Sequence, residues 1–120
     1  ESFALPTGVH MNGKLTLGEN TADNGGVRLA WMALLDSQKG KTLPKVGEFD
    51  QAQQFFLGFA QVWCQNHTPE FERLRAQTDP HAIDKYRVNG VVSNMPEFQK
   101  AFGCREGMPM ARGGKACRVW

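Results

Sequence analysis

The sequence has 120 residues with a formal net charge of +2, and 41% of them are hydrophobic. This length fits one domain that can bury its own core, and the composition is ordinary for a folded protein. The balance of 14 basic and 12 acidic residues, without a Lys/Arg run, excludes the usual nucleic-acid-binding proteins. The longest apolar stretch, residues 55–64, is interrupted by Gly58 and Gln61 and is too short to span a bilayer.

The N-terminus shows no signal-peptide pattern, because no basic segment leads into an apolar one. A chain that begins at Glu1 rather than Met is expected to be a processed product or an expressed fragment. The first 13 residues hold proline and glycine without a sustained period, which predicts an extended lead-in.

The first predicted helix begins at about Leu17, because Thr16 and Glu19 match a capping box. Five apolar residues then repeat at helical spacing and define one buried stripe: Val27, Ala30, Trp31, Leu34 and Leu35. The helix is expected to end within residues 37–40, where polar residues and a glycine form a stop signal.

The second predicted helix is the strongest and covers about residues 51–65, after a capping signature formed by Asp50 and Gln53. Its apolar residues recur at three and four positions: Ala52, Phe55, Phe56, Leu57, Phe59, Ala60, Val62 and Trp63. A stripe of this width predicts a helix that packs on more than one side. Where such a stripe is exposed, it also predicts self-association of the fragment.

A shorter helix is predicted next, with Thr68 as its N-cap, Pro69 as its first residue and an end at about Gln77. Residues 78–81 predict a turn or a fresh helical start. The apolar residues on both sides of the Asn89-Gly90 pair predict a short strand or a hairpin.

The last predicted helix covers about residues 94–102, with Pro96 in its first turn and Gly103 at its end. The tail that follows is rich in Gly, Met and Pro and ends at Trp120, which we expect to be held in a core. The sequence therefore predicts a mainly α fold of four or five helices with long loops and at most one short strand or hairpin.

The three cysteines, Cys64, Cys104 and Cys117, are an odd number, and no CxxC occurs to favour a structural zinc site. One interpretation is a cytosolic protein with three buried thiols. The other is an extracytoplasmic protein with at least one partner cysteine outside this chain. Composition alone leaves both open.

Two acids form the first candidate site. Glu19 and Asp23 lie four residues apart, which places both carboxylates on one face of the first predicted helix. Such a pair serves a metal ion, a catalytic proton transfer or the stabilisation of a helix N-terminus. The apolar stripe continues back through Asp23, so both acids lie at the edge of the buried face. Gly25 and Gly26, each unfavourable in a helix by about 1 kcal/mol, predict close approach of another backbone.

A second candidate pairs His81, in a predicted loop, with Arg87 six residues later. An imidazole and a guanidinium can together bind a substrate carbonyl. The other histidines, His10 and His67, have no partner at ligand spacing, and HExxH is absent. From the residues alone, no metal site within this chain is complete, because zinc needs three protein ligands.

The segment Gly18-Glu19-Asn20-Thr21-Ala22-Asp23-Asn24-Gly25-Gly26 resembles the GENxADxGG motif of the neprilysin-type (M13) zinc metallopeptidases. Five further segments resemble the C-terminal part of that family in order and spacing: residues 55–64, 78–81, 86–90, 98–104 and 117–120. Threonine stands at position 21, where isoleucine is common in the family. The agreement of several independent motifs makes the resemblance specific.

The resemblance implies a zinc site of two histidines and one glutamate. Glu19 would be the third zinc ligand, and both histidines would come from an upstream HExxH helix whose glutamate is the general base. Asp23 would orient one of these histidines. His81 would stabilise the oxyanion of the tetrahedral intermediate, and Arg87 would hydrogen-bond the substrate backbone. Val62 and Trp63 would line an S1′ pocket that favours large apolar side chains.

By this resemblance, residues 1–120 are the C-terminal portion of a larger, mostly helical metallopeptidase catalytic domain, without its HExxH segment and N-terminal lobe. The parent would cleave peptides on the amino side of bulky apolar residues, outside the cytoplasm, while the isolated chain would be inactive. Its cysteines would have lost upstream partners. The alternative is a non-catalytic helical interaction module or pseudopeptidase in which Glu19 only caps its helix.

Overall fold

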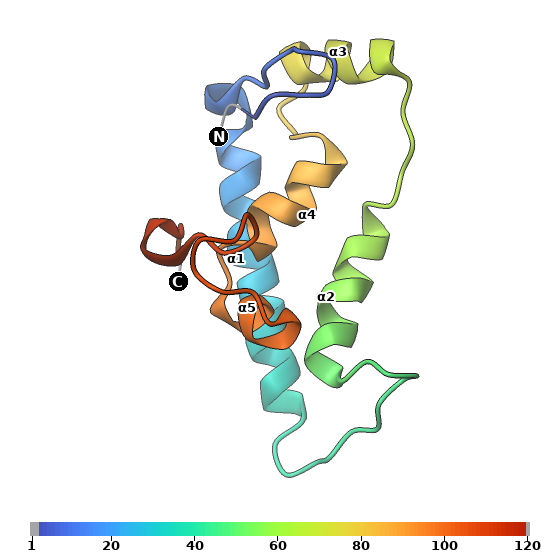
Figure 1. Ribbon diagram of the computed structural model, residues 1–120, viewed down its shortest axis with the longest axis vertical. Helices are drawn as coiled ribbons and strands as arrows, with labels where there is room; N and C mark the ends of the chain where they lie inside the picture. The colour runs from blue at the N-terminus through green and yellow to red at the C-terminus, as the bar shows by residue number, and fades with distance from the viewer. Residues whose placement is uncertain (1–2, 120) are drawn as a thin grey trace.

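The computed structural model describes residues 3–119, which form helices joined by loops (Figure 1). In chain order the helices are α1 (Gly13–Ser37), α2 (Gln51–Val62), α3 (Pro69–Thr78), α4 (Asp84–Val92), α5 (Pro96–Phe102) and the 3-10 turn η1 (Gly113–Lys115). Strand-like pairing within this range is limited to two isolated bridges, Ala4 with His10 and Val46 with Phe49. The predicted mainly α fold is confirmed. None of the described helices is long and apolar enough to cross a membrane.

The long helix α1 begins earlier than the sequence predicts. Its N-cap is Asn12, whose side-chain oxygen accepts a hydrogen bond from the backbone N–H of Leu15 at 3.2 Å. Thr16 is buried within the helix, and its hydroxyl accepts from the Asn20 side chain at 3.1 Å. The predicted capping box is therefore wrong. Glu19 lies in the second turn of α1, where it has no capping role.

The glycine pair of α1 also differs from expectation. Gly25 is buried, whereas a Cβ atom built on Gly26 would meet nothing within 4 Å. The prediction that another backbone approaches closely is therefore wrong at Gly26. Its absent side chain leaves open space on that face of the helix.

The local signals around α2 and α3 are confirmed. Asp50 and Gln53 form a full capping box: the Asp50 carboxylate accepts from Gln53 N at 2.9 Å, and Asp50 N donates to the Gln53 side chain at 3.0 Å. Helix α2 ends at Val62, three residues before the predicted end. Thr68 caps α3 by accepting from the Phe71 N–H at 3.3 Å, and Pro69 is the first residue of α3.

The predicted strand or hairpin around Asn89-Gly90 is wrong, because these residues lie inside α4. Helical geometry buries Val91 and Val92 in the core, and this burial outweighs the turn preference of the Asn-Gly pair. The prediction for α5 is confirmed: Gly103 ends the helix in the left-handed conformation, with φ of 67°. Trp120, which the sequence predicts to be held in a core, lies outside the described residues.

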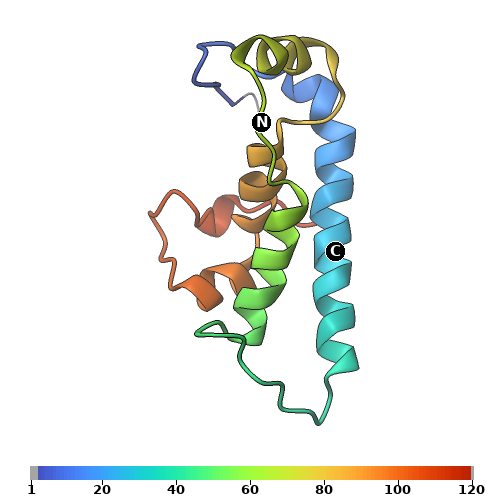
Figure 2. The same ribbon diagram turned by 90° about the vertical axis from the view of Figure 1, so that its right-hand side faces the viewer.

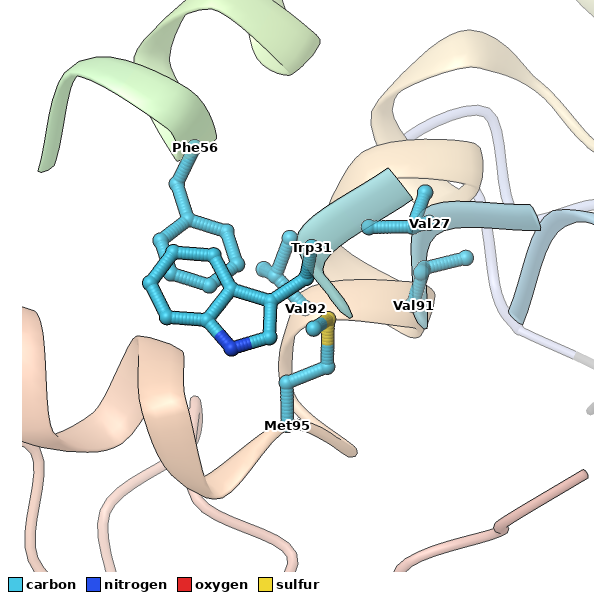
Figure 3. Packing of buried hydrophobic residues seen from close by; sticks show 6 residues of the cluster. All are labelled: Val27, Trp31, Phe56, Val91, Val92 and Met95. Atoms are coloured by element: carbon cyan, nitrogen blue, oxygen red, sulfur yellow. The ribbon is translucent and has the colours of Figure 1, made fainter. Parts of the chain in front are cut away.

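Helix α1 runs along most of the molecule, α4 lies beside it, and α3 lies near its N-terminal end (Figures 1 and 2). Helix α4 packs on α1, while α2 packs on α5 and α4. The main core lies where they meet, and six buried residues form it: Val27, Trp31, Phe56, Val91, Val92 and Met95 (Figure 3). The Trp31 and Phe56 rings stack with centroids 5.4 Å apart. In the wide apolar stripe of α2, only Phe56 is fully buried.

A second, smaller core lies at the α3 end of the molecule. It consists of Leu5, Met11, Ala76, Ala82 and Ile83. These residues come from the N-terminal segment, from α3 and from the turn that leads into α4. The turn that carries His81 is therefore fixed on both sides of the histidine by packing.

We expect Phe56→Ala to lower the free energy of unfolding by about 3–5 kcal/mol, because it empties the centre of the aromatic cluster. Urea unfolding of the chain measures this change. Leu29→Ala on the exposed side of α1 is the control and should change stability by less than about 0.5 kcal/mol. Equal losses in the two variants would contradict this description of the core.

Candidate functional site

Four of the six candidate residues meet where α1, the turn before α4 and α4 itself come together. Glu19 and Asp23 project from α1, His81 lies in the turn, and Arg87 lies on α4. Two contacts connect them across the junction: the ion pair of Asp23 with Arg87, and the approach of the His81 ring to the Glu19 carboxylate. The structure thus brings together side chains that are more than 60 positions apart in the sequence.

The Asp23–Arg87 pair is the firmest contact of the site. Arg87 donates from Nε to Asp23 Oδ2 and from Nη2 to Oδ1, both at 2.7 Å. The side chains are only 12% and 15% exposed, so water competes little for either partner. The hydrogen bonds that Arg87 donates to Asp23 raise the pKa of Arg87 above its usual range, although burial opposes this shift. The guanidinium is therefore fixed in both charge and position.

Trp63 and Val62 lie at the C-terminal end of α2. The Arg87 guanidinium carbon lies 3.9 Å from the centroid of the Trp63 ring, which is a close cation–π contact. Val62 is 67% exposed. Arg87 therefore links three helices, and the exposed Val62 side chain lies one residue from this junction.

Glu19 and His81 form a more open pair. The Nε2 atom of His81 lies 3.4 Å from Glu19 Oε2, and the two side chains are 40% and 43% exposed. Water and small ligands can reach both groups. Of the four side chains at the junction, these two are the more accessible to water and ligands, whereas Asp23 and Arg87 are largely covered.

The orientation of the His81 ring is set by Asp79. Both the backbone N–H and the ring Nδ1 of His81 lie 2.8 Å from Asp79 Oδ1. An ionised carboxylate only accepts hydrogen bonds, so Nδ1 carries a proton and Nε2 is directed toward Glu19. The pKa of Asp79 is lowered, chiefly by the hydrogen bond from the His81 backbone, which keeps the carboxylate ionised.

Sequence reasoning missed Asp79, although the order Asp79-Pro80-His81 contains a usable signal. An aspartate two residues before a histidine in a turn can accept the backbone N–H two positions on. The contacts of His67 carry no comparable signal. Its Nε2 atom lies 2.7 Å from Asp84 Oδ2, across 17 positions of the sequence, and no spacing rule for ligands describes such a pair.

The Glu19 carboxylate is accessible enough to be one ligand of a zinc site. Among the described residues, no group of three or more His, Cys, Asp or Glu side chains is arranged to hold a metal ion. Glu19 offers one accessible carboxylate, whereas zinc sites use three or four protein ligands. Any further ligands would have to come from other polypeptide. The thiols of Cys64, Cys104 and Cys117 are unpaired.

The family model of peptidase family M13 matches residues 1–119. The chain belongs to this family. It is 46% identical over 119 residues to neprilysin-1 of Caenorhabditis elegans, a match that covers 95% of this chain and 16% of that protein. It is also 46% identical over 123 residues to membrane metallo-endopeptidase-like 1 of Mus musculus, covering 99% of this chain and 16% of that protein.

A solved structure has the same fold over this segment. The zinc metalloprotease of Mycobacterium tuberculosis in complex with an inhibitor superimposes with a TM-score of 0.86 at 32% identity. This match covers 96% of the present chain and 17% of the mycobacterial chain. The M13 segment described here therefore spans about one sixth of the length of its curated relatives.

The lowered pKa of Asp79 makes the stability of the M13 segment depend on pH in the acid range. Because this pKa lies below its ordinary value of 3.8, ionised Asp79 stabilises the fold above that pH. The stabilisation is lost as the pH falls through the lowered pKa. We expect Asp79→Asn to remove part of the decrease in unfolding free energy below pH 3.8, measured by urea unfolding between pH 7 and 3.

The matched control for this experiment is Asp36→Asn, at an exposed position near the end of α1. Asp36→Asn should leave the decrease in unfolding free energy at acid pH unchanged. If Asp79→Asn had the same acid response as the unmodified chain, the hydrogen bonds assigned to Asp79 would be absent in solution.

Proposed function

We propose that this chain is the C-terminal portion of the catalytic domain of a zinc metalloendopeptidase and supplies part of its active site. The observation that carries the proposal is the junction of Glu19, Asp23, His81 and Arg87, which contains the motif residues of an M13 peptidase. The name of the mycobacterial structure, a zinc metalloprotease, supports zinc as the cofactor. The activity belongs to the whole protein rather than to these 120 residues alone.

In this proposal Glu19 is one zinc ligand, and two histidines and the general base come from an HExxH segment outside this chain. Bound zinc would polarise a water molecule and the peptide carbonyl. Asp23 has two functions. Its two oxygens have about four acceptor positions, of which Arg87 occupies two, so Asp23 retains the capacity to accept from the N–H of a ligand histidine.

His81 would act on the carbonyl oxygen of the peptide bond. Its Nε2 atom faces the open side of the junction and, when protonated, donates to the oxygen on which negative charge develops. Asp79 holds the ring at Nδ1 and so fixes the direction of Nε2. Both features favour stabilisation of the transition state over binding of the ground state.

Arg87 would bind the substrate backbone next to the scissile bond. Asp23 engages Nε and Nη2, so the guanidinium retains N–H donors on Nη1 for a substrate carbonyl. Val62 and Trp63 would line the S1′ pocket and accept a large apolar side chain. The 67% exposure of Val62, beside the Arg87–Trp63 contact, supports this role.

The substrates are proposed to be peptides cleaved on the amino side of large apolar residues. An extracytoplasmic location is supported by the relative named membrane metallo-endopeptidase-like 1. In that setting Cys64, Cys104 and Cys117 would pair with cysteines outside the chain, since all three are unpaired here. The apolar residues exposed on α1 and α2 would contact the remainder of the enzyme or, in the isolated chain, a second copy.

The alternative function, a helical interaction module with Glu19 as a helix cap, has less support. Asn12 is the cap of α1, and Glu19 lies in the second turn. A pseudopeptidase would differ from an active enzyme in one feature: its full-length sequence would lack HExxH upstream of this segment. Reading the adjoining sequence separates these two.

In the full-length protein we expect Glu19→Gln to lose most bound zinc, because a neutral amide is a weaker zinc ligand than a carboxylate. His81→Phe should keep zinc and lower kcat by about 100-fold or more. Metal analysis and peptide turnover measure the two effects. Glu48→Gln, in the exposed loop before α2, is the matched control for the acid. Full zinc occupancy and unchanged kcat in both variants would remove the support for these roles.

The isolated chain should not hydrolyse a chromogenic peptide when zinc is added, because residues 3–119 contain no group of three ligands arranged to hold a metal ion. The measurement compares turnover with zinc, with zinc and a chelator, and without metal. Turnover that depends on zinc and is abolished by the chelator would show that the site is complete without an HExxH segment.

A further inference from the structure

A group of charged side chains joins α3 to the start of α4, beside the candidate site. Arg75 lies in the last turn of α3, and Asp84 is the first residue of α4. The Asp84 side chain is only 5% exposed and that of Arg75 17%, so both charges are largely removed from water. A buried carboxylate is strongly unfavourable without a partner, which makes these contacts decisive for how the two helices meet.

Arg75 contacts two carboxylates at once. Its Nε donates to Asp79 Oδ2 at 3.2 Å, and its Nη1 lies 3.5 Å from Asp84 Oδ1. The backbone carbonyl of Arg75 also accepts the N–H of Asp79 at 2.9 Å. Arg75 therefore contacts both the backbone N–H and the carboxylate of Asp79.

The other side of Asp84 is held by His67, whose Nε2 lies 2.7 Å from Asp84 Oδ2. The Phe71 ring contacts both ends of this group: its centroid lies 5.0 Å from the His67 ring and 5.8 Å from the guanidinium carbon of Arg75. Arg75 thus lies among two carboxylates and an aromatic ring. Its guanidinium has little freedom to leave Asp79.

We propose that Arg75 is a positioning residue for His81, an inference that rests on the proposed function of His81. Arg75 holds Oδ2 of Asp79, and the other oxygen of the same carboxylate receives Nδ1 and the backbone N–H of His81. A carboxylate fixed at one oxygen presents the second in a fixed direction. The orientation of the imidazole therefore depends on Arg75 in the last turn of α3 as well as on Asp79 in the turn that carries His81.

The geometry favours arginine over lysine at this position. A guanidinium presents several N–H groups in a planar fork and can reach both carboxylates, whereas an ammonium group is a single point of charge. Arg75→Lys keeps the charge but is expected to hold only one carboxylate at a time. It should therefore restore part of the function that Arg75→Met removes.

The first test uses kcat and KM of the full-length enzyme on a chromogenic peptide, together with its zinc content. Arg75→Met should lower kcat by about tenfold, with KM within about twofold and zinc unchanged. Arg75→Lys should fall between Arg75→Met and the unmodified enzyme. Arg73→Met, which removes an exposed arginine of the same helix paired with Glu70, is the matched control and should keep kcat.

A double mutant separates positioning from a general structural effect. If Arg75 acts through His81, Arg75→Met should have almost no further effect on kcat in the His81→Phe enzyme. A further tenfold loss in that background, or an unchanged kcat in the single variant, overturns the proposal. If Arg75→Met does not fold, the same comparison is made with Arg75→Lys.

The second test does not depend on peptidase activity. In the same protein labelled with 15N-histidine, the His81 Nδ1–H resonance is assigned by its loss in His81→Phe. It should persist in Arg73→Met and be lost or broadened in Arg75→Met, as expected for a ring that has lost its fixed partner. An unmodified enzyme without peptidase activity would contradict the proposed function alone, whereas an unchanged resonance in Arg75→Met would contradict the positioning role.

Discussion

The bidentate ion pair between Asp23 and Arg87 is the interaction on which the candidate site depends. It joins α1 to α4, and the contact of Arg87 with Trp63 adds the end of α2. Three helices are thereby fixed at one point by a pair that water hardly reaches. The accessible groups, Glu19 and His81, lie beside this fixed point and do not have to stabilise the fold themselves. The residues that hold the helices together are thus different from the residues that a ligand can reach.

The part of the fold that sequence reasoning predicted is the part set by local contacts. The Asp50–Gln53 capping box, the start of α3 and the end of α5 each depend on residues a few positions apart. Competition between local signals misplaced the start of α1, because Asn12 offered a cap as good as Thr16. The Asn89-Gly90 pair was misread because burial of the neighbouring valines is a tertiary effect.

The candidate site shows the same limit of prediction from sequence more clearly. The family resemblance predicts Glu19, Asp23, His81 and Arg87 as site residues, yet their pairing could not be deduced from spacing. Asp23 and Arg87 are 64 positions apart, and their contact exists only because α4 packs on α1. The Arg75 contacts could not be predicted either, since they require the relative placement of α3 and α4. The sequence thus predicts candidate site residues, while the contacts between them follow from how the helices pack.

The turn between α3 and α4 has a consequence for how this segment can vary in length. Only residues 79–83 separate the two helices, and within them Asp79 and His81 bond to each other while Ala82 and Ile83 are buried. One inserted residue would break the hydrogen-bonded register of the turn. The loop over residues 39–50 is exposed throughout and closes no such contact with the site. We therefore expect insertions and deletions to be tolerated in that loop, whereas the turn between α3 and α4 has a fixed length.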